Sequence, residues 1–138
     1  MSDKSDYLEG EIIKHLFRTG SFTKPTALGI ALFTTAPNKE TGAGGVEVTG
    51  GAYARVNVPP LDANWDAPAN GGDTANTSVV TFPAPSGANW GIAVAFGIYD
   101  ATTAGNLLYS ANLTQSKTIN DGDAAPNFPA GALTVSEQ

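Results

Sequence analysis

Few side chains in this sequence could carry out chemistry, and those few are dispersed. His15 is the single histidine among the 138 residues, and there is no cysteine. A zinc site or a Ser-His-Asp arrangement would therefore depend on one residue within a predicted helix. Close to a helix C-terminus, a histidine is more simply explained as a cation that interacts with the helix dipole. We therefore expect no catalytic residue, no metal site and no cofactor.

One pair of carboxylates could in principle hydrolyse a glycosidic bond. Asp62 and Asp66 lie on either side of Trp65, and paired carboxylates beside an aromatic residue occur in sugar-hydrolysing enzymes. The segment around them is rich in Pro, Ala and Asn, without the apolar residues that tune a carboxylate for catalysis. A solvated loop is therefore the favoured interpretation.

Two loops partly match binding motifs. Residues 42–45 (GAGG) are similar to a phosphate-binding loop, but a strand rather than a helix is predicted to follow them. Residues 120–123 (NDGD) place oxygen ligands close together, yet they lack the series of acidic ligands of a calcium loop. The first match is negligible, and a hairpin turn is favoured over calcium binding for the second.

Aromatic side chains would allow stacking on sugars. The candidates are Trp65, Trp90, Tyr53, Tyr99 and Tyr109. Trp90 and Tyr99 lie within or beside a continuous apolar segment, so core packing is favoured for most of the set. Trp65 stands alone in a polar loop. It either covers one end of the β body or anchors in a pocket of a partner protein, and both interpretations stay open.

Composition restricts the partners. The net charge is −6, with 7 basic and 13 acidic residues, so a nucleic-acid surface is not expected. No apolar run approaches the roughly 18 residues of a membrane span, and residues 1–6 lack the apolar core of a secretory signal. We therefore expect synthesis in a cytoplasm. Charged residues are only 14% of the chain, which favours a surface that packs against other proteins.

The front of the chain predicts the one helix, over residues 5–19. Ser5 can cap its first turn, and Gly20 is expected to end it. Leu8 and the residues that follow at helical spacing form one apolar stripe, which also contains Ile12, Ile13, Leu16 and Phe17. Either this stripe packs across the sheet of its own chain, or part of it docks on a neighbouring subunit. The candidate interface residues are therefore Ile12, Ile13, Leu16, Phe17 and Trp65.

After Gly20 the pattern changes to short strands separated by Gly- and Pro-rich turns. Strands are predicted at residues 27–34, 52–58, 78–82, 91–99, 107–113, 117–119 and 133–135. This spacing predicts a mainly β protein, an antiparallel β-sandwich or barrel-like domain with one N-terminal α-helix. We expect a single domain over residues 1–138, with the helix at 5–19 and the β body at 26–135.

The chain contains a series of short motifs, KPT at 24–26, ALFTTAP at 31–37, GGAYARV at 50–56, NWG at 89–91, FGIYDA at 96–101, GNLLY at 105–109 and FPAGALTV at 128–135. The same motifs occur in the same order in a family of small virion proteins of tailed phages. The motifs cover nearly the whole chain. The sequence therefore resembles this family, whose members are often labelled tail fibre or virion structural proteins.

The resemblance implies a non-enzymatic structural protein on the exterior of a phage particle. The chain is short for a fibre and lacks the repeats or heptads of an elongated shaft, which favours a capsid decoration or cement protein. Capsid three-fold positions would then favour a trimer. The alternatives are a tail fibre or baseplate component and a carbohydrate-binding adhesin domain. Expected partners are major capsid or tail proteins, with neither nucleic acid nor membrane.

Overall fold

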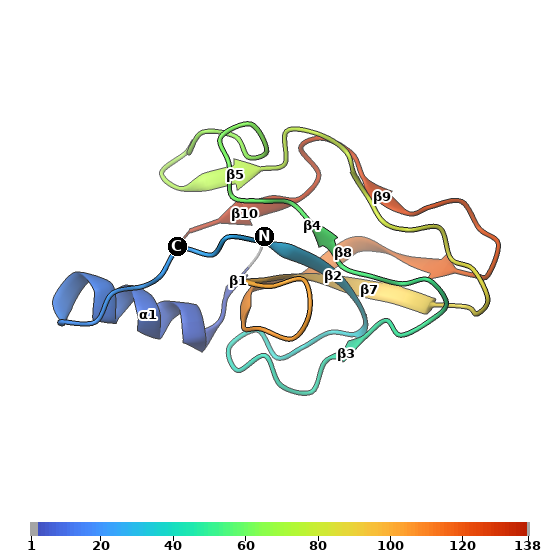
Figure 1. The fold of residues 1–138 in the computed structure, drawn as a ribbon, viewed down its shortest axis with the longest axis horizontal. Coiled ribbons are helices and arrows are strands. Elements are labelled where there is room, and N and C mark those ends of the chain that lie inside the picture. Colours follow the sequence, from blue (N-terminus) through green and yellow to red (C-terminus); the bar gives the residue numbers. More distant parts are fainter. Residues whose placement is uncertain (1–2, 138) are drawn as a thin grey trace.

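The computed structural model describes residues 3–137 and consists mainly of antiparallel β-strands, with one helix near the N-terminus (Figure 1). The predicted fold class, mainly β with one N-terminal α-helix, is confirmed. Met1, Ser2 and Gln138 belong to the predicted domain 1–138 but lie outside the described residues. That the whole chain forms one domain stays a prediction.

A six-stranded antiparallel sheet forms the centre of the molecule. Its strand order is β1-β8-β7-β2-β3, and β4 also pairs with β2. The strands are β1 (Asp3–Lys4), β2 (Gly29–Thr35), β3 (Val46–Glu47), β4 (Val56–Asn57), β7 (Gly91–Tyr99) and β8 (Leu107–Ile119). The longest strands, β7 and β8, form a hairpin, and β2 pairs with the other edge of β7.

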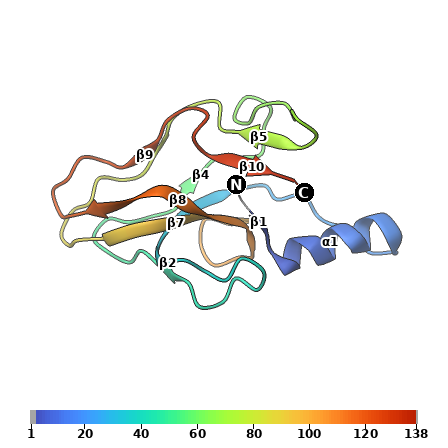
Figure 2. The same ribbon diagram turned by 180° about the vertical axis from the view of Figure 1, so that it is seen from behind.

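Two smaller sheets form a second layer over one face of the central sheet, so the arrangement is sandwich-like (Figures 1 and 2). One consists of β5 (Asp73–Ala75) and β10 (Thr134–Ser136), and the other of β6 (Val80–Thr81) and β9 (Asn127–Phe128). The main core lies between the layers. It contains side chains from the central sheet and from the second layer, among them Ile30, Leu32, Phe96, Ile98, Val80, Phe82, Leu133 and Val135.

The central sheet is apolar on both faces, because successive residues of a strand point to opposite sides. Ile30 and Leu32 of β2 belong to the main core, whereas Ala31 and Phe33 belong to a small cluster on the opposite face. Gly97 of β7 makes room for this second cluster. A Cβ at position 97 would lie 2.8 Å from the Phe33 ring, closer than side chains tolerate.

The long strands agree well with the sequence-based prediction, and the short strands β6 and β10 lie at the segments predicted at 78–82 and 133–135, but the other short strands agree less well. The segments predicted at 91–99 and 27–34 correspond to β7 and β2. Those predicted at 107–113 and 117–119 are one strand, β8, whose pairing with β7 is irregular between Ala93 and Ala95. The strand predicted at 52–58 is reduced to β4. Four strands of two or three residues, β1, β3, β5 and β9, were not predicted, because they are too short to show a periodicity.

Helix α1 spans Asp6–Phe17, so the predicted helix 5–19 is two residues too long at its C-terminal end. Ser5 is the N-cap as predicted, and its side chain accepts a hydrogen bond from the Leu8 amide at 3.3 Å. Arg18 is the C-cap, so the helix ends before it reaches Gly20, which was expected to end it. Figures 1 and 2 show that α1 projects from the β body instead of lying across a sheet.

Asn76 is the polar residue that joins the parts of the second layer. Its side chain is 1% exposed. The Nδ2 amide donates to the Ser78 carbonyl at 2.8 Å and to the Pro129 carbonyl at 3.0 Å, and Oδ1 accepts from the Leu133 amide at 2.9 Å. The three hydrogen bonds together use both ends of the amide, because Nδ2 donates two of them and Oδ1 accepts the third.

The substitution Asn76→Asp is expected to lower the free energy of unfolding by about 3 kcal/mol or more, because it places a buried carboxylate oxygen against two carbonyls. Chemical denaturation measures this. The matched control is Asn112→Asp, at an exposed residue of β8, which should change the free energy of unfolding by less than about 0.5 kcal/mol. Equal effects of the two substitutions would show that Asn76 does not hold the layer together.

Candidate interaction surface

The apolar face of α1, defined here as Ile12, Ile13, Leu16 and Phe17, is mostly exposed. Ile13 is 53%, Leu16 65% and Phe17 75% exposed, and Ile12 is half-buried. Leu8, near the start of the helix, is its buried residue. The interpretation in which the stripe packs across its own sheet is therefore wrong for the C-terminal half of α1. An exposed apolar stripe of this kind marks a contact surface, so docking on a neighbour remains the prediction.

The helix is attached to the β body at its first residue. The Ser5 hydroxyl is buried and donates to the Leu107 carbonyl at 2.5 Å, while the Ser5 amide donates to the Leu108 carbonyl at 2.9 Å. One residue further, the Asp6 amide donates to the Glu40 carbonyl at 2.7 Å. The start of α1 is therefore fixed by hydrogen bonds to the first residues of β8 and to the loop before β3, and the C-terminal half of the helix is exposed.

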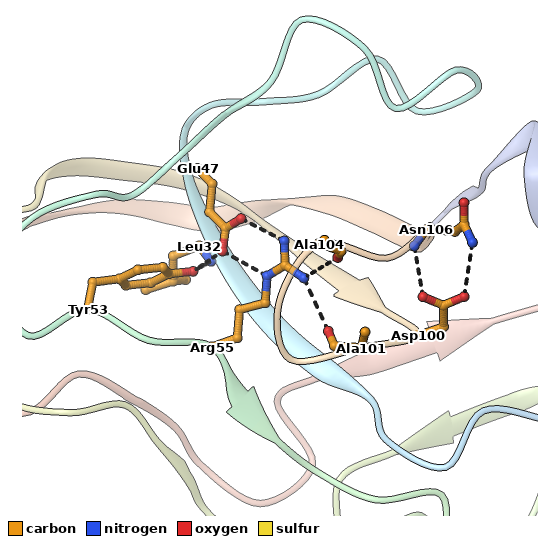
Figure 3. A network of polar contacts seen from close by, with 8 residues as sticks. All are labelled: Leu32, Glu47, Tyr53, Arg55, Asp100, Ala101, Ala104 and Asn106. Carbon is orange, nitrogen blue, oxygen red and sulfur yellow. Dashed lines mark hydrogen bonds and ion pairs between the residues drawn. The ribbon is translucent and has the colours of Figure 1, made fainter.

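Residues 100–106, the loop between β7 and β8, lead directly into this attachment. Within the loop, Asp100 accepts hydrogen bonds from the backbone and side-chain amides of Asn106 (Figure 3). Arg55 reaches the same loop from the segment before β4, and its Nη1 donates to the Ala101 carbonyl at 3.1 Å and to the Ala104 carbonyl at 2.7 Å. These bonds fix the loop, and with it the start of β8 that holds Ser5.

Arg55 is itself held by Glu47 and Tyr99. Its Nε and Nη2 each lie 2.9 Å from one Glu47 carboxylate oxygen, which is a two-point ion pair (Figure 3). Its guanidinium carbon lies 3.7 Å from the centre of the Tyr99 ring, a cation–π contact. Tyr53 completes the cluster, because its hydroxyl donates to Glu47 at 2.7 Å and accepts from the Leu32 amide at 3.0 Å.

Two opposing effects act on the Glu47 carboxyl. Burial raises its pKa, but the hydrogen bonds from Arg55 and Tyr53 and the positive charge of Arg55 outweigh burial and hold the pKa below the ordinary value of 4.5. Tyr53 and Arg55 are two residues apart in the segment predicted as a strand at 52–58, so they were expected on the same face. Nothing in the sequence indicates that Glu47 is the carboxylate that pairs with them.

The second feature of this end of the molecule is a groove of about 740 Å³, called here the acidic groove. Its apolar part contains Leu28, Leu108 and Val135, together with the rings of Trp65 and Tyr109. Four carboxylates also line it, those of Asp62, Asp66, Asp73 and Glu137. The groove therefore combines an apolar surface with a local excess of negative charge.

Trp65 covers the core from within this groove. Its ring packs against the main core, its Nε1 donates to the Val58 carbonyl at 3.4 Å, and its backbone forms a bridge with Asn76. Trp65 is thus a lid over the β body, as one of its two interpretations predicted. Because it also lines the groove, its predicted contact with a partner stays a prediction. Trp65 lines the acidic groove, and no residue of α1 does.

The five aromatic candidates do not form one sugar-binding platform. Trp90 is buried in the core, where its ring meets that of Tyr53 edge-on. Tyr99 stacks beneath Arg55, on the side of the sheet where it contacts Phe33. Only Trp65 and Tyr109 share a surface, the acidic groove, where the Tyr109 hydroxyl donates to Glu137.

The remaining motifs have structural roles. The His15 Nδ1 accepts from the Phe22 amide at 3.2 Å. Residues 42–45 precede β3 rather than a helix, and residues 120–123 form a turn in which the Asp123 carboxylate accepts from the Asn120 amide at 2.8 Å.

Among residues 3–137 there is no group of three or more acidic, histidine or cysteine side chains placed to hold a metal ion. In the same part of the chain, no helix has the length and apolarity needed to cross a membrane.

Replacing Glu47 by Gln is expected to lower the free energy of unfolding at neutral pH by about 1–2 kcal/mol, because the substitution removes the charged partner of Arg55. The lowered pKa of Glu47 stabilises the fold above pH 4.5, and this contribution is lost as the pH falls through the pKa of the folded state. The difference between the native protein and the variant should therefore shrink below pH 4.5. Urea denaturation over a pH series measures it.

The control for this series is Glu40→Gln, at an exposed loop residue, which should change the free energy of unfolding at pH 7 by less than about 0.5 kcal/mol. A Glu47→Gln variant with the stability of the native protein at pH 7 would contradict the assigned role of the ion pair.

Comparison with known proteins adds one finding to this geometry. No curated protein matches the sequence. A family model described as Podophage GP4 fiber I protein gp80 matches residues 3–136, which include α1, the strands β1 to β10 and the residues of the acidic groove except Glu137. The match therefore covers nearly the whole chain, and it agrees with the motifs that indicated a tailed-phage virion protein. The chain belongs to the family of the podophage GP4 fiber I protein gp80, a family of phage fibre proteins with a structural role in the virion.

Proposed function

We propose that this protein is a non-enzymatic component of a tail-fibre-type assembly on the exterior of a tailed-phage particle. The observation that carries the proposal is the family match over residues 3–136, together with an apolar helix face that the chain itself leaves exposed. A subunit of an assembly needs such a surface, and an isolated soluble domain does not.

Placement on a fibre replaces capsid decoration as the favoured role. Decoration was expected because the chain is short and has no shaft repeats. The family description favours the fibre alternative, and a short chain can contribute one module to a longer fibre. The trimer expected from capsid three-fold positions rested on the capsid placement, and it stays a prediction. The adhesin alternative has less support, since three of the five aromatic residues considered for sugar stacking, Trp90, Tyr53 and Tyr99, do not line the groove.

Within this proposal, the apolar face of α1 joins the protein to the rest of the particle. Leu16 and Phe17 are its most exposed members, and both lie at the end of the helix furthest from the attachment at Ser5. Partner proteins of the virion would therefore meet these residues first. Contact with packaged DNA is disfavoured, because a protein of net charge −6 repels phosphate.

The substitution Leu16→Asp should abolish incorporation into particles while leaving the fold intact. Because Leu16 is 65% exposed, the free energy of unfolding should change by less than about 1 kcal/mol. A charge in the docked, desolvated contact would cost several kcal/mol. The measurement is the amount of the protein in purified virions, by mass spectrometry, from cells that supply only the variant.

The matched control is Val79→Asp, at an exposed apolar residue of the β body with 58% exposure, which should be incorporated normally. Immunogold labelling of the same virions tests the placement. Gold on the fibres is expected, whereas gold spread over the capsid surface would overturn the fibre assignment.

A further inference from the structure

Two surfaces at the same end of the molecule lack a partner and have complementary chemistry. One is the apolar face of α1 and the other is the acidic groove. In both views α1 lies at the end of the molecule that also contains β5, β10 and the end of the described chain, which contribute to the groove (Figures 1 and 2). No residue of α1 lines the groove, so the chain does not cover its own groove with its own helix.

Some carboxylates of the acidic groove form no ion pair among the residues that the structure describes. Asp62 and Asp66 are exposed, and within residues 3–137 neither carboxylate forms an ion pair. Glu137 is different, because it accepts from the Tyr109 hydroxyl and pairs with Lys4 at 2.8 Å. Asp73 on β5 likewise forms no ion pair within residues 3–137, so the unpaired carboxylates of the groove come from the loop around Trp65 and from β5. Its occupant should combine apolar side chains with a cation.

The end of α1 has this combination. Leu16 and Phe17 are followed directly by Arg18, which is exposed and, in the described part of the chain, forms no ion pair. Lys14, one turn earlier, pairs only with Glu11 of the same helix, at 2.9 Å. Thus two large apolar side chains and an available guanidinium lie together on the projecting part of the helix.

We propose that the end of α1 from one copy docks into the acidic groove of a second copy, with Leu16 and Phe17 on the apolar part of the groove and Arg18 beside Asp62 and Asp66. The helix and the groove lie at the same end, so two copies that face each other can form both contacts about a two-fold axis. Local attraction between opposite charges also offsets the repulsion between two chains of net charge −6.

This inference deepens the proposed function, since it rests on α1 being the assembly surface and identifies what that surface binds. It is tested on the purified protein, whereas the proposed function is tested on particles. If Leu16→Asp blocks incorporation while the purified native protein stays monomeric, the proposed function stands and the docking of two copies is overturned.

The test exchanges charges between the two surfaces. Sedimentation velocity over a concentration series is measured for the native protein, for Arg18→Glu and for Asp66→Lys. Native protein should self-associate, and each variant alone should show a dissociation constant raised about tenfold or more, because both contacts of a pair then place like charges together. An equimolar mixture of the two variants should associate with close to native affinity. In the mixed pair, one contact is native and the other has its charges inverted but still opposite.

Restored association in the mixture is specific to contact between these two residues, because a variant that failed by misfolding would not recover. The control variant is Lys117→Glu, at an exposed residue of β8, which should associate like the native protein. Circular dichroism confirms that α1 is intact in every variant. A native protein that stays monomeric at the highest concentration, or a mixture no tighter than either variant alone, would overturn the proposal.

Discussion

Ser5 holds the helix to the body of this protein, and the exposure of the interaction surface depends on it. Its backbone amide and buried hydroxyl donate to the carbonyls of Leu108 and Leu107, and the same hydroxyl accepts from the Leu8 amide to cap the helix. One residue thus both starts α1 and fastens it to β8. A helix held by an apolar face would hide that face. Because α1 is held mainly by hydrogen bonds at its first residue and by burial of Leu8, its remaining apolar side chains are available to another molecule.

The carbonyls that accept these hydrogen bonds lie at the start of β8, so the position of the helix depends on the loop that leads into this strand. Residues 100–106 precede Leu107, and their shape is fixed internally by Asp100 and externally by Arg55. Glu47 and Tyr99 in turn hold the guanidinium in one position. Arg55 suits this position because its planar fork pairs with a carboxylate at two points and still donates to backbone carbonyls, which a lysine ammonium does with less geometric definition. The polar cluster of Figure 3 is therefore part of the support of the helix, although none of its residues lies on the interaction surface.

The fibre family and the physical features of the chain lead to the same kind of protein. A low charge density, an exposed apolar helix end and an acidic apolar groove are the properties of a subunit that works in contact with other chains. The expectation of a capsid role rested on the short chain, whereas the family description favours a fibre, to which a short chain can contribute one module. The aromatic residues show a similar distinction. Most of them fill the core or support Arg55, and only Trp65 and Tyr109 reach the groove.

Features that depend on neighbours along the chain were determined by the sequence itself. The start of α1 at its Ser5 cap and the long strands β2 and β7 follow from local capping and continuous apolar runs, and family motifs over nearly the whole chain indicated a phage virion protein. Features that depend on residues far apart in the chain were decided only by the tertiary structure. The pairing of β5 with β10, the partner of Arg55 and the exposure of Leu16 and Phe17 are of this kind. An apolar stripe shows that a helix can bury one face, but the sequence does not contain the position of the surface that would cover it. In this fold the hydrogen bonds at Ser5 direct the helix away from the sheet, so the stripe remains uncovered.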